Sequence, residues 1–163
     1  QRQMCIRDSP YTGAFASLKA EDHRAVEEAA ERAGVTTLLD APATDLSGGQ
    51  RQRVWVAMTV AQQTPVLLLD EPTTYLDPAH QIAILDLVRE LNSAGRTVVM
   101  VVHDMTHAAR FADFIVAMRD GQVLSAGETE DVMSAQLVEQ LFGISCLEAR
   151  DPETGRVLPI PYR

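Results

Sequence analysis

The segment "LSGGQRQRVWVAM" (residues 46–58) places a serine and two glycines in front of a basic, apolar-periodic stretch. Serine is a favoured N-cap of an α-helix, and glycines in the first turn leave the backbone N–H groups uncovered. Such a helix start binds anions, because its N–H groups and the positive end of the helix dipole point at the ligand. Ser47, Gly48 and Gly49 are therefore predicted to contact a phosphate, with the Ser47 hydroxyl as a further donor. A serine and two glycines without other motifs also form ordinary turns.

Two adjacent carboxylates, Asp70 and Glu71, follow the apolar run "VLLL" (residues 66–69). Neighbouring residues of a strand point to opposite sides, so the two carboxylates can serve different tasks. One can hold a hydrated magnesium ion, and the other can polarise a water as a general base. Ligands of open α/β sheets bind beyond the carboxyl ends of the strands, where this pair lies. The alternative is an exposed acidic loop.

A histidine, His103, follows a second apolar run, "VVMVV" (residues 98–102). It could donate a hydrogen bond to a bound phosphate, and the alternative is a structural or capping histidine. A hydrolase triad of Ser47, His103 and Asp104 is disfavoured, because no G-x-S-x-G turn surrounds the serine. The other three histidines fall in predicted helices and are interpreted as surface or packing residues: His23, His80 and His107.

The elements that must position these side chains alternate along the sequence. Helices are predicted at about residues 17–34, 47–63, 77–95, 105–112 and 129–143, and buried strands at 65–72 and 96–104. A hairpin with an Asp120-Gly121 turn is predicted at 114–128, and a terminal hairpin around 151–155. The buried stripe of the second helix is expected to consist of Val54, Ala57, Met58 and Ala61. Alternation of strands and helices predicts an α/β fold with a mostly parallel sheet covered on both faces, beside a helical lobe formed by the first sixty residues.

Composition and charge exclude several classes of protein. The sequence has 163 residues and a formal net charge of -9, which disfavours a nucleic-acid partner held by phosphate contacts. Cys5 and Cys146 form neither a zinc signature nor a disulfide framework, so a reducing cytoplasm is the default expectation. The longest purely apolar run, residues 98–102, is far shorter than the roughly 20 residues of a membrane helix. A water-soluble protein is expected, which leaves room for a membrane partner.

The order "LSGGQ", "LLLDEP", "TTYLD" and a strand ending in histidine resembles the nucleotide-binding ATPase subunit of ABC transporters. The resemblance covers about residue 10 to the C-terminus. It implies a P-loop NTPase fold of the ABC ATPase type, with an α-helical signature subdomain and a C-terminal β-hairpin. The segments "TTYLD", "AHQ" and "DPETGRVLPIP" look most like the subfamily that energises uptake of iron-siderophores, haem or cobalamin.

The resemblance also implies roles for single residues. Leu46 to Gln50 would be the signature motif, whose Ser47, Gly48, Gly49 and Gln50 face ATP held by the other subunit of a head-to-tail homodimer. Asp70 would associate with Mg²⁺, Glu71 would be the general base and His103 the switch histidine. The loop from Thr74 to Asp77 would signal between subunits, and Asp77 would be a further nucleotide-binding residue. Further partners implied are a membrane permease and, indirectly, a substrate-binding protein, with the subunit peripheral on the cytoplasmic face of the bacterial plasma membrane.

The phosphate loop G-x-x-x-x-G-K-[ST] does not occur in the sequence, and its only lysine, Lys19, lies in "SLKAED". We therefore expect an N-terminally incomplete subunit that is inactive as an ATPase on its own. The expected division is an unrelated or artefactual leader at 1–9, the helical signature subdomain at 10–64, and the distal half of the ATPase core with the hairpin at 65–163. Two alternatives stay open: a soluble ABC ATPase not linked to transport, and a non-functional gene fragment.

Overall fold

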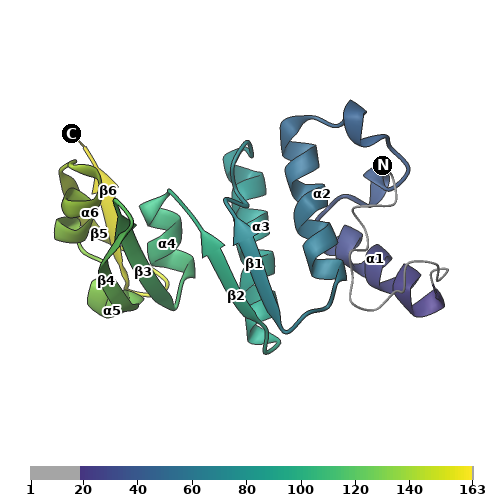
Figure 1. Ribbon diagram of the computed structural model, residues 1–163. Helices are drawn as coiled ribbons and strands as arrows, with labels where there is room; N and C mark the ends of the chain where they lie inside the picture. The colour runs from purple at the N-terminus through teal and green to yellow at the C-terminus, as the bar shows by residue number, and fades with distance from the viewer. Residues whose placement is uncertain (1–18, 163) are drawn as a thin grey trace. The chain divides into compact units, whose positions relative to one another are not determined.

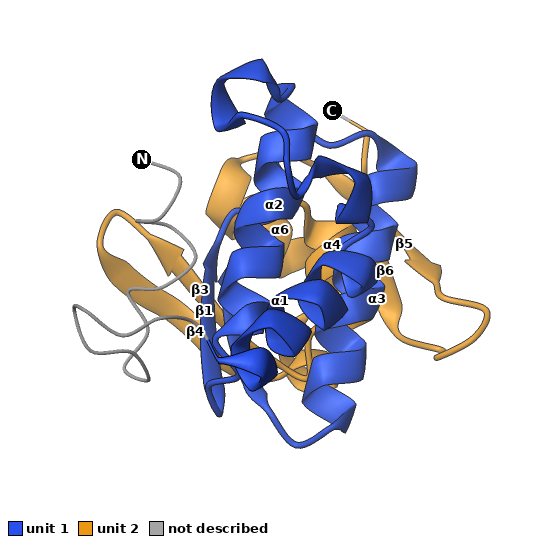
Figure 2. Ribbon diagram, turned by 90° about the vertical axis from the view of Figure 1, so that its right-hand side faces the viewer, with its two compact units in different colours: residues 1–101 blue, residues 102–163 orange. Residues whose placement is uncertain are grey.

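A computed structural model describes residues 19–162 of the chain (Figure 1). The chain forms two compact units, which divide after Val101 (Figure 2). The predicted leader, residues 1–9, lies outside the described residues, and the predicted domain boundary after residue 64 stays a prediction.

The described part of the first unit contains three α-helices, two 3₁₀ turns and two strands. Their bounds are α1 (Ala20–Arg32), η1 (Thr36–Leu38), η2 (Ala43–Asp45), α2 (Gly48–Ala61), β1 (Val66–Asp70), α3 (Pro78–Ser93) and β2 (Thr97–Val101). The helix starts follow local chemistry. Lys19 is the N-cap of α1, Ser47 caps α2, and Asp77 caps α3 with Pro78 in the first turn, where its missing N–H costs nothing. The predicted start of α3, at about residue 77, is confirmed.

The two strands of this unit pair in parallel, from Val66 with Thr97 to Asp70 with Val101. Their side chains alternate in burial: Leu67 is 1% exposed, whereas Leu68 is 72% exposed. The expectation of strands buried on both faces is therefore wrong for the described residues, because helices cover one face of the pair and leave the other open. A continuous apolar run cannot distinguish these two situations.

The core of the first unit joins α1, α2 and α3 to the covered face of the strands. Leu67 and Val98 from the strands pack with one cluster of buried residues from the three helices and the turn after α1: Ala29, Ala30, Ala33, Val35, Val56, Ala57, Val60, Ile84, Leu87 and Leu91. The predicted stripe of α2 is displaced. The fully buried residues of this helix are Val56, Ala57 and Val60, whereas the other three residues of the predicted stripe are partly buried.

The second unit consists of a short helix, two hairpins and two further helical segments. Their bounds are α4 (Met105–Phe111), β3 (Phe114–Arg119), β4 (Gln122–Glu128), α5 (Thr129–Val132), α6 (Ala135–Phe142), β5 (Cys146–Arg150) and β6 (Val157–Pro161). Both predicted hairpins are confirmed as antiparallel pairs. The single helix predicted at 129–143 is wrong. It breaks before Ser134, whose hydroxyl accepts a hydrogen bond from Leu137 N and starts a new helix.

An ion pair and hydrogen bonds connect the terminal hairpin to α4. The Asp151 side chain, 1% exposed, receives Arg110 Nε at 3.2 Å. It also accepts hydrogen bonds from the backbone N–H groups of Glu153 and Thr154, which shape the turn between β5 and β6. Arg156 donates to the carbonyl of Ala112, directly after α4. The hairpin and α4 thus form one packed body within the second unit.

Candidate functional site

The signature segment begins α2 with a reciprocal capping box. Gln50 N donates to Ser47 Oγ at 3.2 Å, and Ser47 N donates to Gln50 Oε1 at 2.9 Å. The box satisfies two of the backbone donors that a helix start leaves without intrahelical partners. The N–H groups of Gly48 and Gly49 lie between them in the first turn. The prediction that α2 starts at Ser47 is confirmed, and it places two glycine amides at a positive helix end.

The two glycines lie against the chain's own loop of residues 73–77. A Cβ at Gly48 would lie 3.6 Å from Tyr75 Cβ, an ordinary contact. A Cβ at Gly49 would lie 3.1 Å from the Tyr75 carbonyl oxygen and 3.3 Å from Leu76 Cδ2, which is tighter than side chains usually allow. A side chain at position 49 would thus be crowded by a contact within the chain itself. This contact joins segments far apart in the sequence and was not predicted, and the approach of a partner's phosphate stays a prediction.

A pocket of about 450 Å³ opens between the start of α2 and the 73–77 loop. We call it the signature pocket, and its lining residues are Ser47, Gly48, Gly49, Gln50, Arg53, Tyr75, Leu76, Asp77 and His80. Five of these were predicted as nucleotide-contacting residues, so the structure brings that predicted set together. The pocket also contains Arg53 and His80, which the sequence interpretation left without a functional role.

Asp77 forms the acidic wall of the signature pocket. Its Oδ1 accepts a hydrogen bond from His80 N at 3.0 Å, as a helix cap does, and its Oδ2 lies 2.6 Å from His80 Nδ1. The His80 backbone N–H, followed by the His80 side chain, holds the pKa of Asp77 below its ordinary value. The pocket therefore combines glycine N–H groups on one wall with an ionised carboxylate on another.

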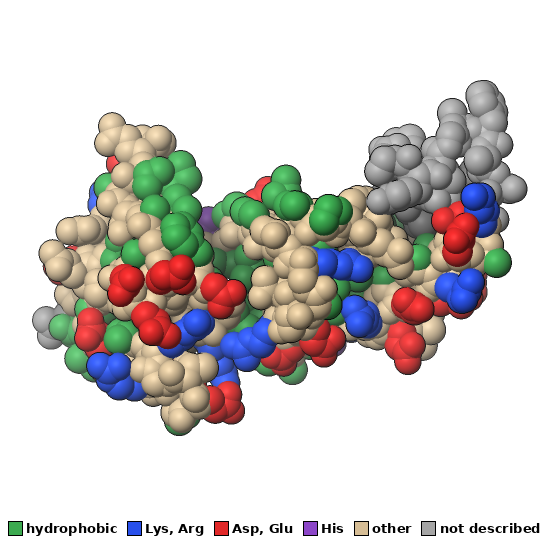
Figure 3. Space-filling model, turned by 90° about the horizontal axis from the view of Figure 1, so that it is seen from below, with side chains coloured by type: hydrophobic (Ala, Val, Ile, Leu, Met, Phe, Trp, Pro, Cys, Tyr) green, Lys and Arg blue, Asp and Glu red, His purple; other side chains and the backbone are tan. Residues whose placement is uncertain are grey.

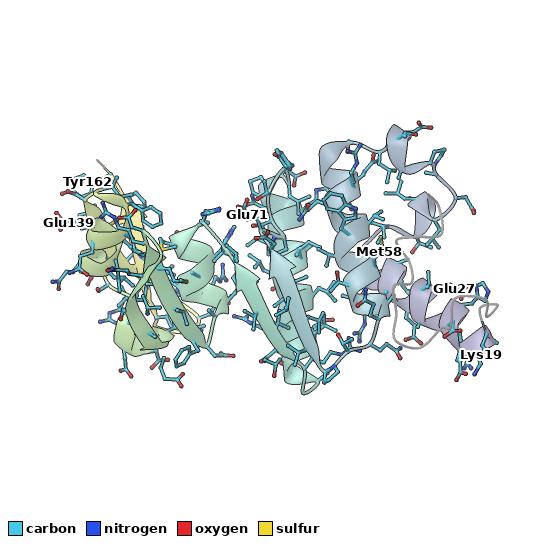
Figure 4. All side chains as sticks on the ribbon, viewed as in Figure 1. Lys19, Glu27, Met58, Glu71, Glu139 and Tyr162 are labelled. Carbon is cyan, nitrogen blue, oxygen red and sulfur yellow. The ribbon has the colours of Figure 1, made fainter. Side chains whose placement is uncertain are left out.

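Glu71 stands at the carboxyl end of β1 with a backbone φ of +45° (Figure 4). Strand alternation therefore does not extend to it, and the argument that it points opposite to Asp70 fails at this residue. Its carboxylate accepts a hydrogen bond from Thr74 Oγ1 at 3.0 Å, and its carbonyl accepts one from Gln52 Nε2 on α2. Tyr75 also has a positive φ, +64°. Left-handed backbone at two non-glycine residues concentrates strain at this loop, which is typical of functional sites.

Asp70 is exposed, and among residues 19–162 no cluster of three or more acidic, histidine or cysteine side chains could hold a metal ion. Mg²⁺ keeps several waters in proteins and is usually held by one or two carboxylates together with phosphate oxygens. Asp70 would be the ligand for such a hydrated ion. The predicted place of Asp70 at the end of a strand is confirmed, and its role as a magnesium ligand stays a prediction.

His103 lies in the second unit, between β2 and α4, and is exposed. The next residue, Asp104, caps α4 by accepting hydrogen bonds from Thr106 N and His107 N. Capping gives the Asp104 carboxylate a local structural role. The role of His103 as a phosphate-contacting switch residue stays a prediction.

No helix within residues 19–162 is long and apolar enough to cross a membrane. On the face shown in Figure 3, acidic and basic side chains are interspersed with apolar ones, and no extended basic patch gathers there.

Comparison with known proteins defines the class. The family model "ABC transporter" matches residues 1–74, and solved neighbours are ABC cassettes with the P-loop NTPase fold. A metal-chelate type ABC transporter in an inward-facing conformation aligns with a TM-score of 0.79 and 28% identity, over 93% of this chain and 61% of that chain. A dimeric post-hydrolysis ATP-binding cassette with ADP and phosphate aligns with a TM-score of 0.63 and 33% identity, over 71% and 50%. The chain belongs, over most of its length, to the ATPase domains of ABC transporters.

Among curated relatives, the ferric enterobactin transport ATP-binding protein FepC of Escherichia coli (strain K12) is 42% identical over 153 residues. The alignment covers 93% of this chain and 56% of the relative. The chain thus spans about half the length of the curated relatives that it matches.

Proposed function

We propose that this chain supplies the signature half of a shared ATP site, in an ATP-binding subunit that energises import of an iron-siderophore, haem or cobalamin. The observation that carries the proposal is the signature pocket, where a capped helix start with two glycines faces an ionised aspartate. The substrate class is supported by the name of the Escherichia coli relative, which refers to ferric enterobactin transport, and by the metal-chelate type of the solved neighbour.

In the proposed site, Ser47, Gly48, Gly49 and Gln50 face the γ-phosphate of ATP that a second, head-to-tail subunit holds. The glycines admit the phosphate, and the helix start stabilises its charge. The dimeric state of a solved cassette with ADP and phosphate supports a homodimer. This sequence has no phosphate loop, which is the segment that usually binds the β- and γ-phosphates. Residues outside the signature pocket must therefore bind the nucleotide.

Catalysis in this proposal depends on position and charge, as in phosphoryl transfer generally. The Glu71 carboxylate accepts a proton from the attacking water, and its hydrogen bond from Thr74 fixes the orientation of that carboxylate. Asp70 would hold a hydrated Mg²⁺, which supplies charge neutralisation at the phosphates when bound. His103 donates a hydrogen bond to the transferred phosphate.

The transport role requires partners outside this chain. We propose that the helical residues of the 10–64 segment contact a membrane permease at the cytoplasmic face of the bacterial plasma membrane. A substrate-binding protein would act indirectly, through that permease. Affinity capture of the complete subunit from detergent-solubilised membranes tests this: an integral membrane permease should co-purify, whereas capture of nucleic acid or ribosomes without a permease would contradict the transport role.

The shared site is tested by ATP-driven dimerisation of the complete subunit, measured by light scattering. Gly49→Asp adds a negative charge where the phosphate should come, so we expect ATP binding without dimerisation. Gly49→Ala is the matched control for added volume, because its methyl group meets the same Tyr75 carbonyl without a charge. Normal ATP-driven dimerisation of the aspartate variant would exclude a phosphate at this helix start.

A further inference from the structure

The Asp77 carboxylate is held at both oxygens by one residue. Oδ1 accepts from His80 N, and Oδ2 lies 2.6 Å from His80 Nδ1. A carboxylate can only accept, so the imidazole must carry its proton on Nδ1 and donate it to Oδ2. The first bond is the ordinary cap of α3. The second is an additional, charge-assisted contact that the cap does not need.

This second contact restricts a side chain that would otherwise turn. The side chains of Asp77 and His80 are 59% and 41% exposed, so packing alone does not lock the carboxylate. With the cap bond alone, only Oδ1 is restrained, and small combined rotations about the Cα–Cβ and Cβ–Cγ bonds could move Oδ2 while Oδ1 stays near His80 N. Both residues line the signature pocket, so any such rotation changes the acidic wall opposite Gly48 and Gly49.

We propose that His80 is a positioning residue that fixes the Asp77 carboxylate on the wall of the signature pocket, where a nucleotide-bearing partner subunit would contact it. The inference rests on the proposed function, since it assumes that a nucleotide-bearing partner enters this pocket. His80 does not touch the reacting atoms itself. It acts through Asp77, and loss of its side chain leaves the backbone cap and hence α3 in place.

The test uses the complete subunit and compares the steady-state kinetics of four variants with the parent. His80→Ala should lower kcat about 10-fold or more, because misplaced site groups slow reactions to this degree, while the KM for MgATP stays within about twofold. His80→Asn should restore kcat, because its amide nitrogen occupies the place of Nδ1. His80→Gln extends its nitrogen one bond further and should not. His23→Ala, which removes an exposed histidine from α1, is the control.

A second readout follows the side chain directly. NMR titration of the Asp77 carboxyl should show its pKa rising toward the ordinary value in His80→Ala and returning toward the parental value in His80→Asn. Parental kcat in His80→Ala, or equal kcat in the asparagine and glutamine variants, would overturn the role of His80 and leave the proposed function intact. A parent subunit without ATPase activity would overturn the proposed function, and the inference with it.

Discussion

At the scale of single residues, Glu71 carries the main chemical prediction. In the complete subunit, Glu71→Gln keeps the shape of the side chain and an oxygen for the Thr74 hydroxyl, but it removes the base. We expect ATP binding to persist and hydrolysis to slow by roughly 10²–10⁴-fold, the range for loss of a general base. An ATP-loaded dimer should accumulate, detectable by size-exclusion chromatography.

Glu90→Gln is the matched control for Glu71→Gln, because Glu90 is an exposed residue of α3 outside the signature pocket. It should retain the parental ATPase rate. If Glu71→Gln also hydrolysed ATP at the parental rate, Glu71 would not be the base.

Residues differ in how far the sequence alone could predict them. Ser47 and Asp77 were predictable because capping is local chemistry within one turn of helix. The left-handed backbone of Glu71 and Tyr75 was not, because only glycine or asparagine usually signals it. The contact of Gly49 with the Tyr75 carbonyl depends on tertiary packing. His80 was missed, although its place three residues after a helix cap, within reach of the cap's side chain, was a usable signal.

At the scale of elements, the turn between β5 and β6 predicts an acid-sensitive contact. The backbone N–H groups of Thr154 and Glu153, followed by Arg110, hold the pKa of Asp151 below its ordinary value of about 3.9. A carboxyl whose pKa is lowered by folding stabilises the fold above its unfolded pKa. It loses that contribution as the pH falls through the lower, folded pKa.

We therefore expect Asp151→Asn to lower stability at pH 7 and to approach the parent below about pH 4, near the unfolded value. Urea unfolding of the 163-residue chain between pH 7 and pH 3 measures both curves. Asp120→Asn removes the same charge from a side chain that is 89% exposed, and it serves as the control. A constant difference between parent and Asp151→Asn across this range would show that the carboxylate is not the stabilising group.

The elements themselves were predicted with uneven success, for physical reasons. Helix starts and hairpin turns follow from capping and turn residues, and most predicted elements occur near their expected positions. The break before Ser134 was missed because an apolar pattern continued across it, while its hydroxyl capped the following turn. The open face of β1 was missed because burial depends on what covers a strand, which its own residues do not encode.

At the scale of the whole molecule, the 163-residue chain is expected not to bind MgATP at micromolar concentration and to have no ATPase activity. It contains the signature pocket without a phosphate loop, and its net charge of -9 repels the nucleotide. Exposed apolar residues on β1 and β2 should also make it marginally soluble. Isothermal titration calorimetry on the monomeric chain is the measurement. Tight stoichiometric binding would show that this chain holds phosphates elsewhere.

Lys19, at the start of α1, is a single side-chain site for amine-selective chemical labelling. It is the only lysine in the sequence, and its side chain is 77% exposed. Arginine stays protonated under mild conditions and does not compete as a free amine. Amine-reactive dyes should therefore label this chain at one side chain, besides the α-amino group. A fluorophore placed there would report on the α1 helix without altering any residue of the signature pocket.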